Sequence, residues 1–116
     1  MPYLQLRLEI EGETREVFGL VDSGSTVNVL PYNVGLELGA VWENQRIPLI
    51  LMGNLAGFEA RALFVTAQIK DFSPIELAFA WTKSEYATLL LGQTNFFSEF
   101  EVCFFRAKGE FEITKR

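Results

Sequence analysis

The residues best suited to chemistry are Asp22, Ser23, Gly24 and Ser25, which directly follow the apolar run 18–21. The chemistry on offer is that of one carboxylate, which is costly to ionise at the end of an apolar strand unless donors or a second group stabilise it. Gly24 allows the backbone to approach the carboxylate and donate N–H groups, and the hydroxyl of Ser25 offers a further donor. The alternative is a simple turn cap, because Asp and Ser both favour such loops.

The residue types that are missing exclude several other kinds of site. The chain has no histidine, which excludes Ser-His-Asp and Cys-His catalysis as well as histidine metal sites. Its single cysteine, Cys103, cannot form a disulfide within the chain and lies in an apolar run typical of a core position. We therefore expect neither a metal site nor a disulfide framework.

Length and composition indicate one globular domain spanning residues 1–116. Hydrophobic residues make up 49% of the chain and charged residues 22%, and the 11 Phe indicate apolar surface that a partner subunit covers. The net charge of -5 argues against nucleic acid and anionic membrane surfaces as partners. The first residues lack the pattern of a signal peptide and the apolar runs are too short to span a membrane, so a cytoplasmic location is the expectation.

Hydrophobic periodicity predicts a chain made mostly of strands. In residues 3–10 apolar and polar side chains alternate, whereas the continuous apolar run 18–21 predicts a strand end that is buried on both faces. Strands are expected at 3–10, 15–21, 27–30, 46–52, 58–68, 75–81, 88–91, 101–106 and 110–114, and short helical turns at 33–39 and 93–97. Many short strands with few helical turns indicate an all-β fold, a small closed or partly open β-barrel.

Three segments of the chain carry a resemblance to a known family. The segment 22–24 (Asp-Ser-Gly) follows two apolar residues, and the segment 90–92 (Leu-Leu-Gly) is an apolar pair followed directly by glycine. Between them lies the segment 52–58, which has glycines at both shoulders. In this order the segments resemble the catalytic loop, the flap hairpin and the supporting element of the retropepsin-like (retroviral-type) single-domain aspartic peptidases, although a plain hairpin turn is the alternative at 52–58.

The resemblance implies a mechanism that one chain cannot complete. In the family two aspartates flank one water: one carboxylate acts as general base, and the other, protonated, donates to the carbonyl of the bond being cut. Two adjacent carboxylates cannot both ionise, so the pair shares a proton. Here the only other aspartate, Asp71, lies in a polar turn. The resemblance thus implies a homodimer with Asp22 from each subunit and Ser23 bonding across the dimer. From its hydroxyl alone, Ser25 is expected to bond the Asp22 carboxylate, with an ordinary turn residue as the alternative.

The expected activity is that of an aspartic endopeptidase acting on a peptide or protein substrate, with apolar side chains flanking the cut bond. An extended peptide would lie between the subunits and pair with the flaps through its backbone. The expected substrate-binding residues are Leu20, Leu30, Met52, Gly53, Asn54, Leu55, Ala56, Gly57 and Phe58. Leu91 and Gly92 are expected to support the catalytic loop, and no metal or organic cofactor is implied.

One departure from the family and two other functions stay open at this stage. Retroviral members usually carry Arg after the glycine of the supporting element, where this chain has Gln93, which cannot form the ion pair that helps to tie the dimer. The alternative function is a non-catalytic dimeric β-barrel that binds peptides or serves as an assembly module. A further possibility is a peptidase that processes only itself or one dedicated partner.

Overall fold

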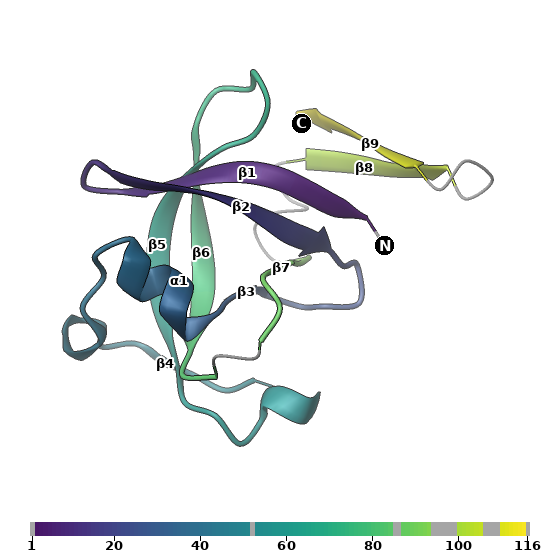
Figure 1. Ribbon diagram of the computed structural model, residues 1–116. Helices are drawn as coiled ribbons and strands as arrows, with labels where there is room; N and C mark the ends of the chain where they lie inside the picture. The colour runs from purple at the N-terminus through teal and green to yellow at the C-terminus, as the bar shows by residue number, and fades with distance from the viewer. Residues whose placement is uncertain (1, 52, 85–86, 94–99, 106–109, 116) are drawn as a thin grey trace.

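The computed structural model describes residues 2–51, 53–84, 87–93, 100–105 and 110–115, and Figure 1 shows their arrangement. The strands are β1 (Tyr3–Ile10), β2 (Glu13–Val21), β3 (Asn28–Leu30), β4 (Pro48–Leu49), β5 (Ala60–Gln68), β6 (Ile75–Thr82), β7 (Leu90–Leu91), β8 (Phe100–Phe105) and β9 (Glu110–Lys115). The helical elements are α1 (Tyr32–Glu37) and the 3-10 turns η1 (Trp42–Asn44) and η2 (Gly53–Leu55).

The main sheet closes into a small six-strand barrel. Its strands follow the order β1-β2-β7-β3-β6-β5, with β4 added beside β5, and β5 returns to pair with β1 between Arg7↔Gln68 and Glu9↔Thr66. The β2–β7 and β3–β6 pairs are parallel and the other pairs are antiparallel, so the barrel is mixed. The expectation of a small, mostly β barrel with few helical turns is confirmed.

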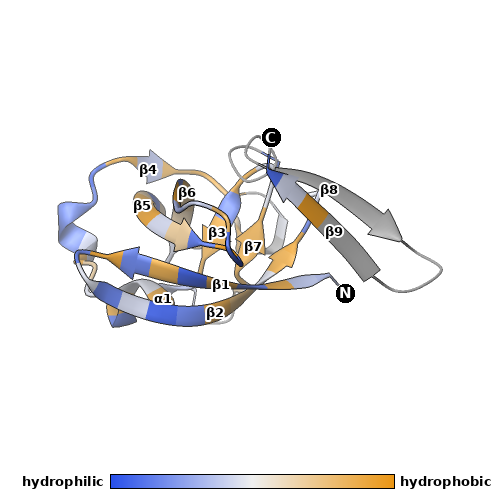
Figure 2. Cartoon of the chain, turned by 90° about the horizontal axis from the view of Figure 1, so that it is seen from above, coloured by the Kyte–Doolittle hydropathy of each residue, from blue (hydrophilic) through white to orange (hydrophobic). Residues whose placement is uncertain are grey.

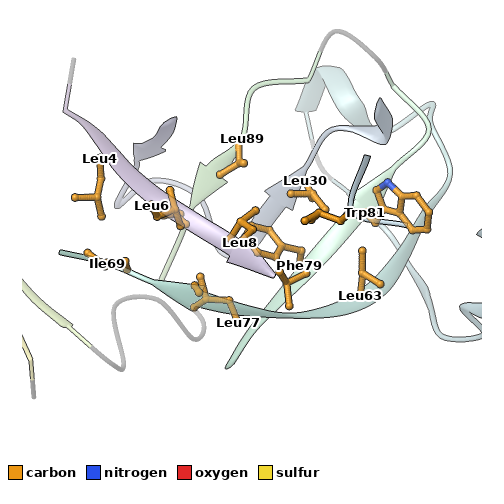
Figure 3. Packing of buried hydrophobic residues seen from close by; sticks show 14 of the residues in the cluster. Leu4, Leu6, Leu8, Leu30, Leu63, Ile69, Leu77, Phe79, Trp81 and Leu89 are labelled. Atoms are coloured by element: carbon orange, nitrogen blue, oxygen red, sulfur yellow. The ribbon is translucent and has the colours of Figure 1, made fainter. Parts of the chain in front are cut away.

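The alternation of residues in β1 explains how the barrel is filled. Leu4, Leu6 and Leu8 point inward and are buried, while their polar neighbours are exposed, as the period of two requires. They meet the inward side chains of β5 and β6, among them Phe79 and Trp81 (Figure 3). This single cluster runs through the barrel and also includes Leu30 and Leu91 next to the candidate site.

The prediction of a doubly buried strand end at residues 18–21 is wrong for a single copy of the chain. Gly19 and Val21 face the interior and are buried, but Phe18 is 63% exposed on the opposite face. The reason is that the period of two holds to the end of β2, and the outer face of the barrel at this point lies open. The run of apolar residues therefore gives the end of β2 an apolar outer surface, on which no second layer of the described chain packs.

An aromatic corner holds α1 against the barrel. Tyr32 stacks on Trp81 with ring centroids 5.6 Å apart, and Trp42 meets Trp81 edge-on at 5.1 Å. A Cβ at Gly35 would lie 2.3 Å from atoms of the Trp81 ring, so only glycine lets α1 approach this closely. These contacts fix the position of the chain directly after β3. The sequence did not predict the 3-10 turn that carries Trp42.

The last two strands form a separate two-stranded sheet (Figure 1). They pair antiparallel from Phe100↔Lys115 to Phe105↔Glu110, which confirms the predicted final hairpin. Ile113 is 6% exposed and belongs to the main hydrophobic cluster, so the sheet is anchored to the barrel. Most of the predicted helical turn at 93–97 lies outside the described residues. In the part of the chain that the structure describes, no helix has the length and apolar character needed to cross a membrane.

Candidate functional site

Three strands of the barrel position the Asp22 loop, residues 22–27. The short strand β7 lies between β2 and β3, parallel to β2 through Leu20↔Leu90 and Val21↔Leu91 and antiparallel to β3 through Val29↔Leu90. The loop thus leaves the sheet on one side of β7 and returns on the other. The Asp22 N–H donates to Leu91 O at 3.0 Å, so the base of the loop is part of the sheet.

The half-buried carboxylate of Asp22 is held by the backbone of its own loop. The Gly24 N–H donates to Asp22 Oδ1 at 2.9 Å, as expected from the sequence. The Ser25 N–H donates to Asp22 O at 3.1 Å and closes the turn. A Cβ at Gly24 would lie 3.2 Å from Asp22 Oδ1, so glycine gives the carboxylate room at this contact. One carboxylate oxygen has a fixed backbone donor, which orients the group toward the pocket described below.

The Ser25 hydroxyl does not bond the carboxylate, and that expectation is wrong. It donates instead to Val27 O at 2.7 Å. A hydroxyl has one proton to donate, and in this turn that proton goes to the carbonyl two residues along the loop. Ser25 therefore shapes the loop that carries Asp22 and leaves the second carboxylate oxygen open to other donors.

Gly92 lies directly beneath the Asp22 loop. A Cβ there would stand 2.5 Å from Val27 O and 2.8 Å from Ser25 O, both backbone atoms that cannot move independently of the loop. Its neighbour Leu91 is fully buried in the main cluster. The structure thus places the two residues expected to support the loop in contact with its underside.

Two polar side chains beneath the loop were missed as site residues. Asn28 is fully buried; its Oδ1 accepts from the Gly92 N–H at 2.8 Å and its Nδ2 donates to Ala78 O at 3.0 Å. The backbone N–H of Gln93 donates to Ser25 O at 2.9 Å, and its side-chain amide donates to Ser23 O. The signal for Asn28 was its position inside an apolar strand, because a buried amide needs fixed partners.

A pocket of about 350 Å³ opens between the Asp22 loop and the segment 50–55. Its described lining residues are Asp22, Gly24, Ser25, Thr26, Val27, Val29, Ile50, Leu51, Gly53, Leu55 and Leu90. Among them Asp22 is the only ionisable side chain, and most of the others are apolar. The pocket therefore suits an apolar group placed next to a single carboxylate.

The segment expected to form a flap covers this pocket as a loop with a short strand at its base. The predicted strand 46–52 is confirmed only at β4, which pairs with β5 through Leu49↔Ala60, and the connection contains the unpredicted turn η2. Leu49, Leu51 and Leu55 turn inward and pack on a second small cluster formed with Val29. Packing of these leucines on the barrel thus favours a folded loop over a longer hairpin.

The remaining expected wall residues have different places. Leu30 is fully buried in the main cluster (Figure 3), because strand β3 directs it into the barrel, so it does not line the pocket. Leu20 is half-buried on the outer face of β2, and Ala56, Gly57 and Phe58 are exposed at the end of the flap segment. Met52 and the side chain of Asn54 lie outside the described residues. Val27, Val29, Ile50, Leu51 and Leu90 are lining residues that the sequence did not single out.

Neither a search for metal ligands nor a comparison with known proteins adds a function for this site. No three His, Cys, Asp or Glu side chains come together as metal ligands within the described ranges. Neither the protein-family models nor the curated proteins include a match to this chain.

Proposed function

We propose that the protein is an aspartic endopeptidase of the retropepsin type, active as a homodimer in which each subunit supplies Asp22. The observation that carries the proposal is the surroundings of this carboxylate. It is held by the Gly24 N–H at 2.9 Å and faces an apolar pocket beneath a folded flap segment. A turn cap needs the backbone bond but has no need of an apolar pocket.

The second carboxylate has to come from a second copy of the chain. Asp22 is the only ionisable residue among the described lining residues of the pocket. Asp71, the other aspartate, is exposed in the turn between β5 and β6. A symmetric dimer brings the two equivalent loops together at its axis, where each contributes the same residue.

The chemistry follows from placing two carboxylates side by side. Ionising both would bring two negative charges within a few ångströms, so the pair retains one proton. The ionised member takes a proton from a water molecule as this water attacks the peptide carbonyl, and the protonated member donates to the carbonyl oxygen. The fixed Gly24 donor orients one oxygen of each carboxylate, and the other oxygen is left for the water or the partner.

The lining of the pocket indicates the substrate class. Val27, Val29, Ile50 and Leu90 surround the space beside the carboxylate, so an aliphatic side chain next to the cut bond would be desolvated there. The peptide would lie extended beneath the flap segment, with alternate side chains entering the pockets of the two subunits.

The test is cleavage of a mixed peptide library from acidic to neutral pH by wild type, Asp22→Asn and Asp71→Asn. Asp22→Asn is expected to lose at least about 1,000-fold in kcat/KM, because it removes the ionisable group that moves the proton. Asp71→Asn is the matched control and should keep wild-type activity. Chelators should have no effect.

Two results would contradict the proposal. Equal activity of Asp22→Asn and wild type would show that the cleavage comes from another protein. A demonstrated dimer that cleaves no peptide in the library would favour the non-catalytic peptide-binding or assembly module.

A further inference from the structure

The outer face of β2 carries a row of side chains that leads to the candidate catalytic residue. Phe18, Leu20 and Asp22 are spaced by two residues, so they lie on the same side of the chain, opposite the inward-facing Gly19 and Val21. Phe18 is 63% exposed, and the hydropathy of the strand changes from hydrophilic to hydrophobic toward this end (Figure 2). An exposed aromatic ring thus lies four residues from the carboxylate.

The neighbouring strand widens this row into a strip. The register of β1 and β2 places Tyr3 opposite Leu20 and Gln5 opposite Phe18, and Tyr3 is 51% exposed. Tyr3, Phe18 and Leu20 are therefore named the β2 strip. At its far side the next pair in the register, Arg7↔Glu16, forms an ion pair at 2.8 Å. The strip is an apolar surface with a charged, internally neutralised rim, as in many protein interfaces.

We infer that the β2 strip is covered by a second copy of this chain. The inference rests on the proposed function, because it takes from it that two Asp22 carboxylates meet on a symmetry axis. Around such an axis the interface consists of one patch that contacts its own copy. Phe18 is four residues from Asp22, about 13 Å along a strand at 3.3 Å per residue. A standard interface of about 800 Å² per partner, drawn as a disc centred on the axis, has a radius of about 16 Å. Phe18 would therefore lie within it.

The pocket and the strip lie on different sides of Asp22. The pocket extends from the Asp22 loop toward Ile50 and Leu55, whereas the strip follows β2 and β1 away from it. Substrate in the pocket would therefore leave Tyr3 and Phe18 exposed. A permanent partner removes this apolar area from water, and a second copy is the partner that the incomplete pair of carboxylates already requires.

Phe64 offers a matched comparison elsewhere on the barrel. It is 56% exposed on the outer face of β5, opposite Ala78 of β6. Its outer row continues through Ala62 and Thr66 and does not lead to Asp22. Single exposed aromatic residues of this kind are common on monomers. Replacing Phe64 therefore shows how the loss of an exposed ring outside the β2 strip affects the protein.

The experiment compares Phe18→Glu with Phe64→Glu by sedimentation equilibrium, together with cleavage of an apolar peptide at each protein concentration. Phe18→Glu is expected to weaken dimerisation on the order of 100-fold, about tenfold for each of the two copies, since each places a charge in the covered interface. Phe64→Glu should dimerise as wild type. Circular dichroism checks the fold, and Phe18→Gln replaces Phe18→Glu if that variant does not fold.

The outcomes separate this inference from the proposed function. A wild-type dimer weakened by Phe18→Glu supports the inference whether or not peptide is cleaved, and absent cleavage contradicts only the function. Wild type that is monomeric at all concentrations overturns the inference. It is also overturned if Phe18→Glu leaves the affinity of the dimer unchanged. If this variant also raises KM, the β2 strip contacts substrate and not a second copy. Equal weakening by Phe64→Glu overturns it as well.

Discussion

The two aspartates of this chain, Asp22 and Asp71, follow strands that end in the same hydrophobic core, yet their surroundings differ in every other respect. Asp22 is half-buried, accepts from the Gly24 N–H, and lies at a pocket. Asp71 is exposed in the turn between two antiparallel neighbours, β5 and β6. The comparison separates an aspartate that the fold supports from one that only turns the chain.

The difference arises from the connection that each aspartate has to make. The turn at Asp71 joins two adjacent strands and needs only its own residues. The loop at Asp22 passes over the end of β7, so its shape depends on Gly92, which is distant in sequence, and on Asn28, whose side chain binds the Gly92 N–H. A loop that is held from below can keep a carboxylate at a fixed position, which proton transfer requires.

The largest expected effect comes from removing the space beneath the Asp22 loop. Gly92→Ala places a Cβ 2.5 Å from Val27 O, and because the conflict is with backbone it should lower the free energy of unfolding by about 3 kcal/mol. Gly57→Ala is the control, since a Cβ there meets nothing within 4 Å. Thermal and urea unfolding measure both. A loss below about 1 kcal/mol for Gly92→Ala would contradict the close approach.

A somewhat smaller effect is expected from Asn28→Ala. The change leaves the Gly92 N–H and Ala78 O without their side-chain partner in a fully buried place, which should cost about 2–3 kcal/mol of unfolding free energy. Asn33→Ala, at an exposed position of α1, should change stability by less than about 0.5 kcal/mol. Urea unfolding tests the pair, and equal values would show that the Asn28 amide does not support the loop.

Ser25→Ala and Ser73→Ala compare the aspartate loops directly. Ser25→Ala removes the bond to Val27 O at 2.7 Å and should cost about 1 kcal/mol, with a loss of cleavage that exceeds the loss of stability. Ser73 is exposed in the Asp71 turn, so its replacement should be silent in both measurements. Unchanged cleavage by a folded Ser25→Ala protein would mean that the shape of the Asp22 loop does not matter for the proposed activity.

The sequence was sufficient for most of the barrel because its strands show clear local patterns. Alternation in residues 3–10 and glycine or proline at the turns predicted strands close to those observed. The failures came where tertiary packing decides between patterns that look alike. The apolar run at Phe18 predicted a covered face that is open within one copy of the chain, and of the expected strand 46–52 only β4 forms, with Leu51 packed on the barrel from the loop that follows.

At the candidate site, the sequence was sufficient for the loop but not for its surroundings. Asp22 and Gly24 form a local motif, and their hydrogen bond follows from residues two apart. Whether a neighbouring apolar residue faces the pocket or the core depends on strand register: Val29 lines the pocket, while the next residue, Leu30, is in the core. Asn28 supports Gly92 across 64 positions of sequence, a separation that no local pattern reveals.

The smallest expected effect is also the one that tests whether Asp22 works as a pair. Wild type and Asp22→Asn are mixed in equal amounts, at constant total protein and with time for subunits to exchange, and cleavage is measured. If each site needs two ionisable Asp22 side chains, only wild-type dimers are active, and random pairing leaves about one quarter of the activity of unmixed wild type. Sites that act independently would leave about half.

The mixing experiment needs a matched control and a second measurement, the dependence of activity on the fraction of wild-type protein. Mixing wild type with Asp71→Asn should leave the activity unchanged, because the exposed turn takes no part in the pair. Across other ratios, activity should follow the square of the wild-type fraction, since both subunits of an active dimer must be wild type. A straight line through the same points would mean that Asp22 acts within a single chain, and the supported loop would then complete its site without a partner.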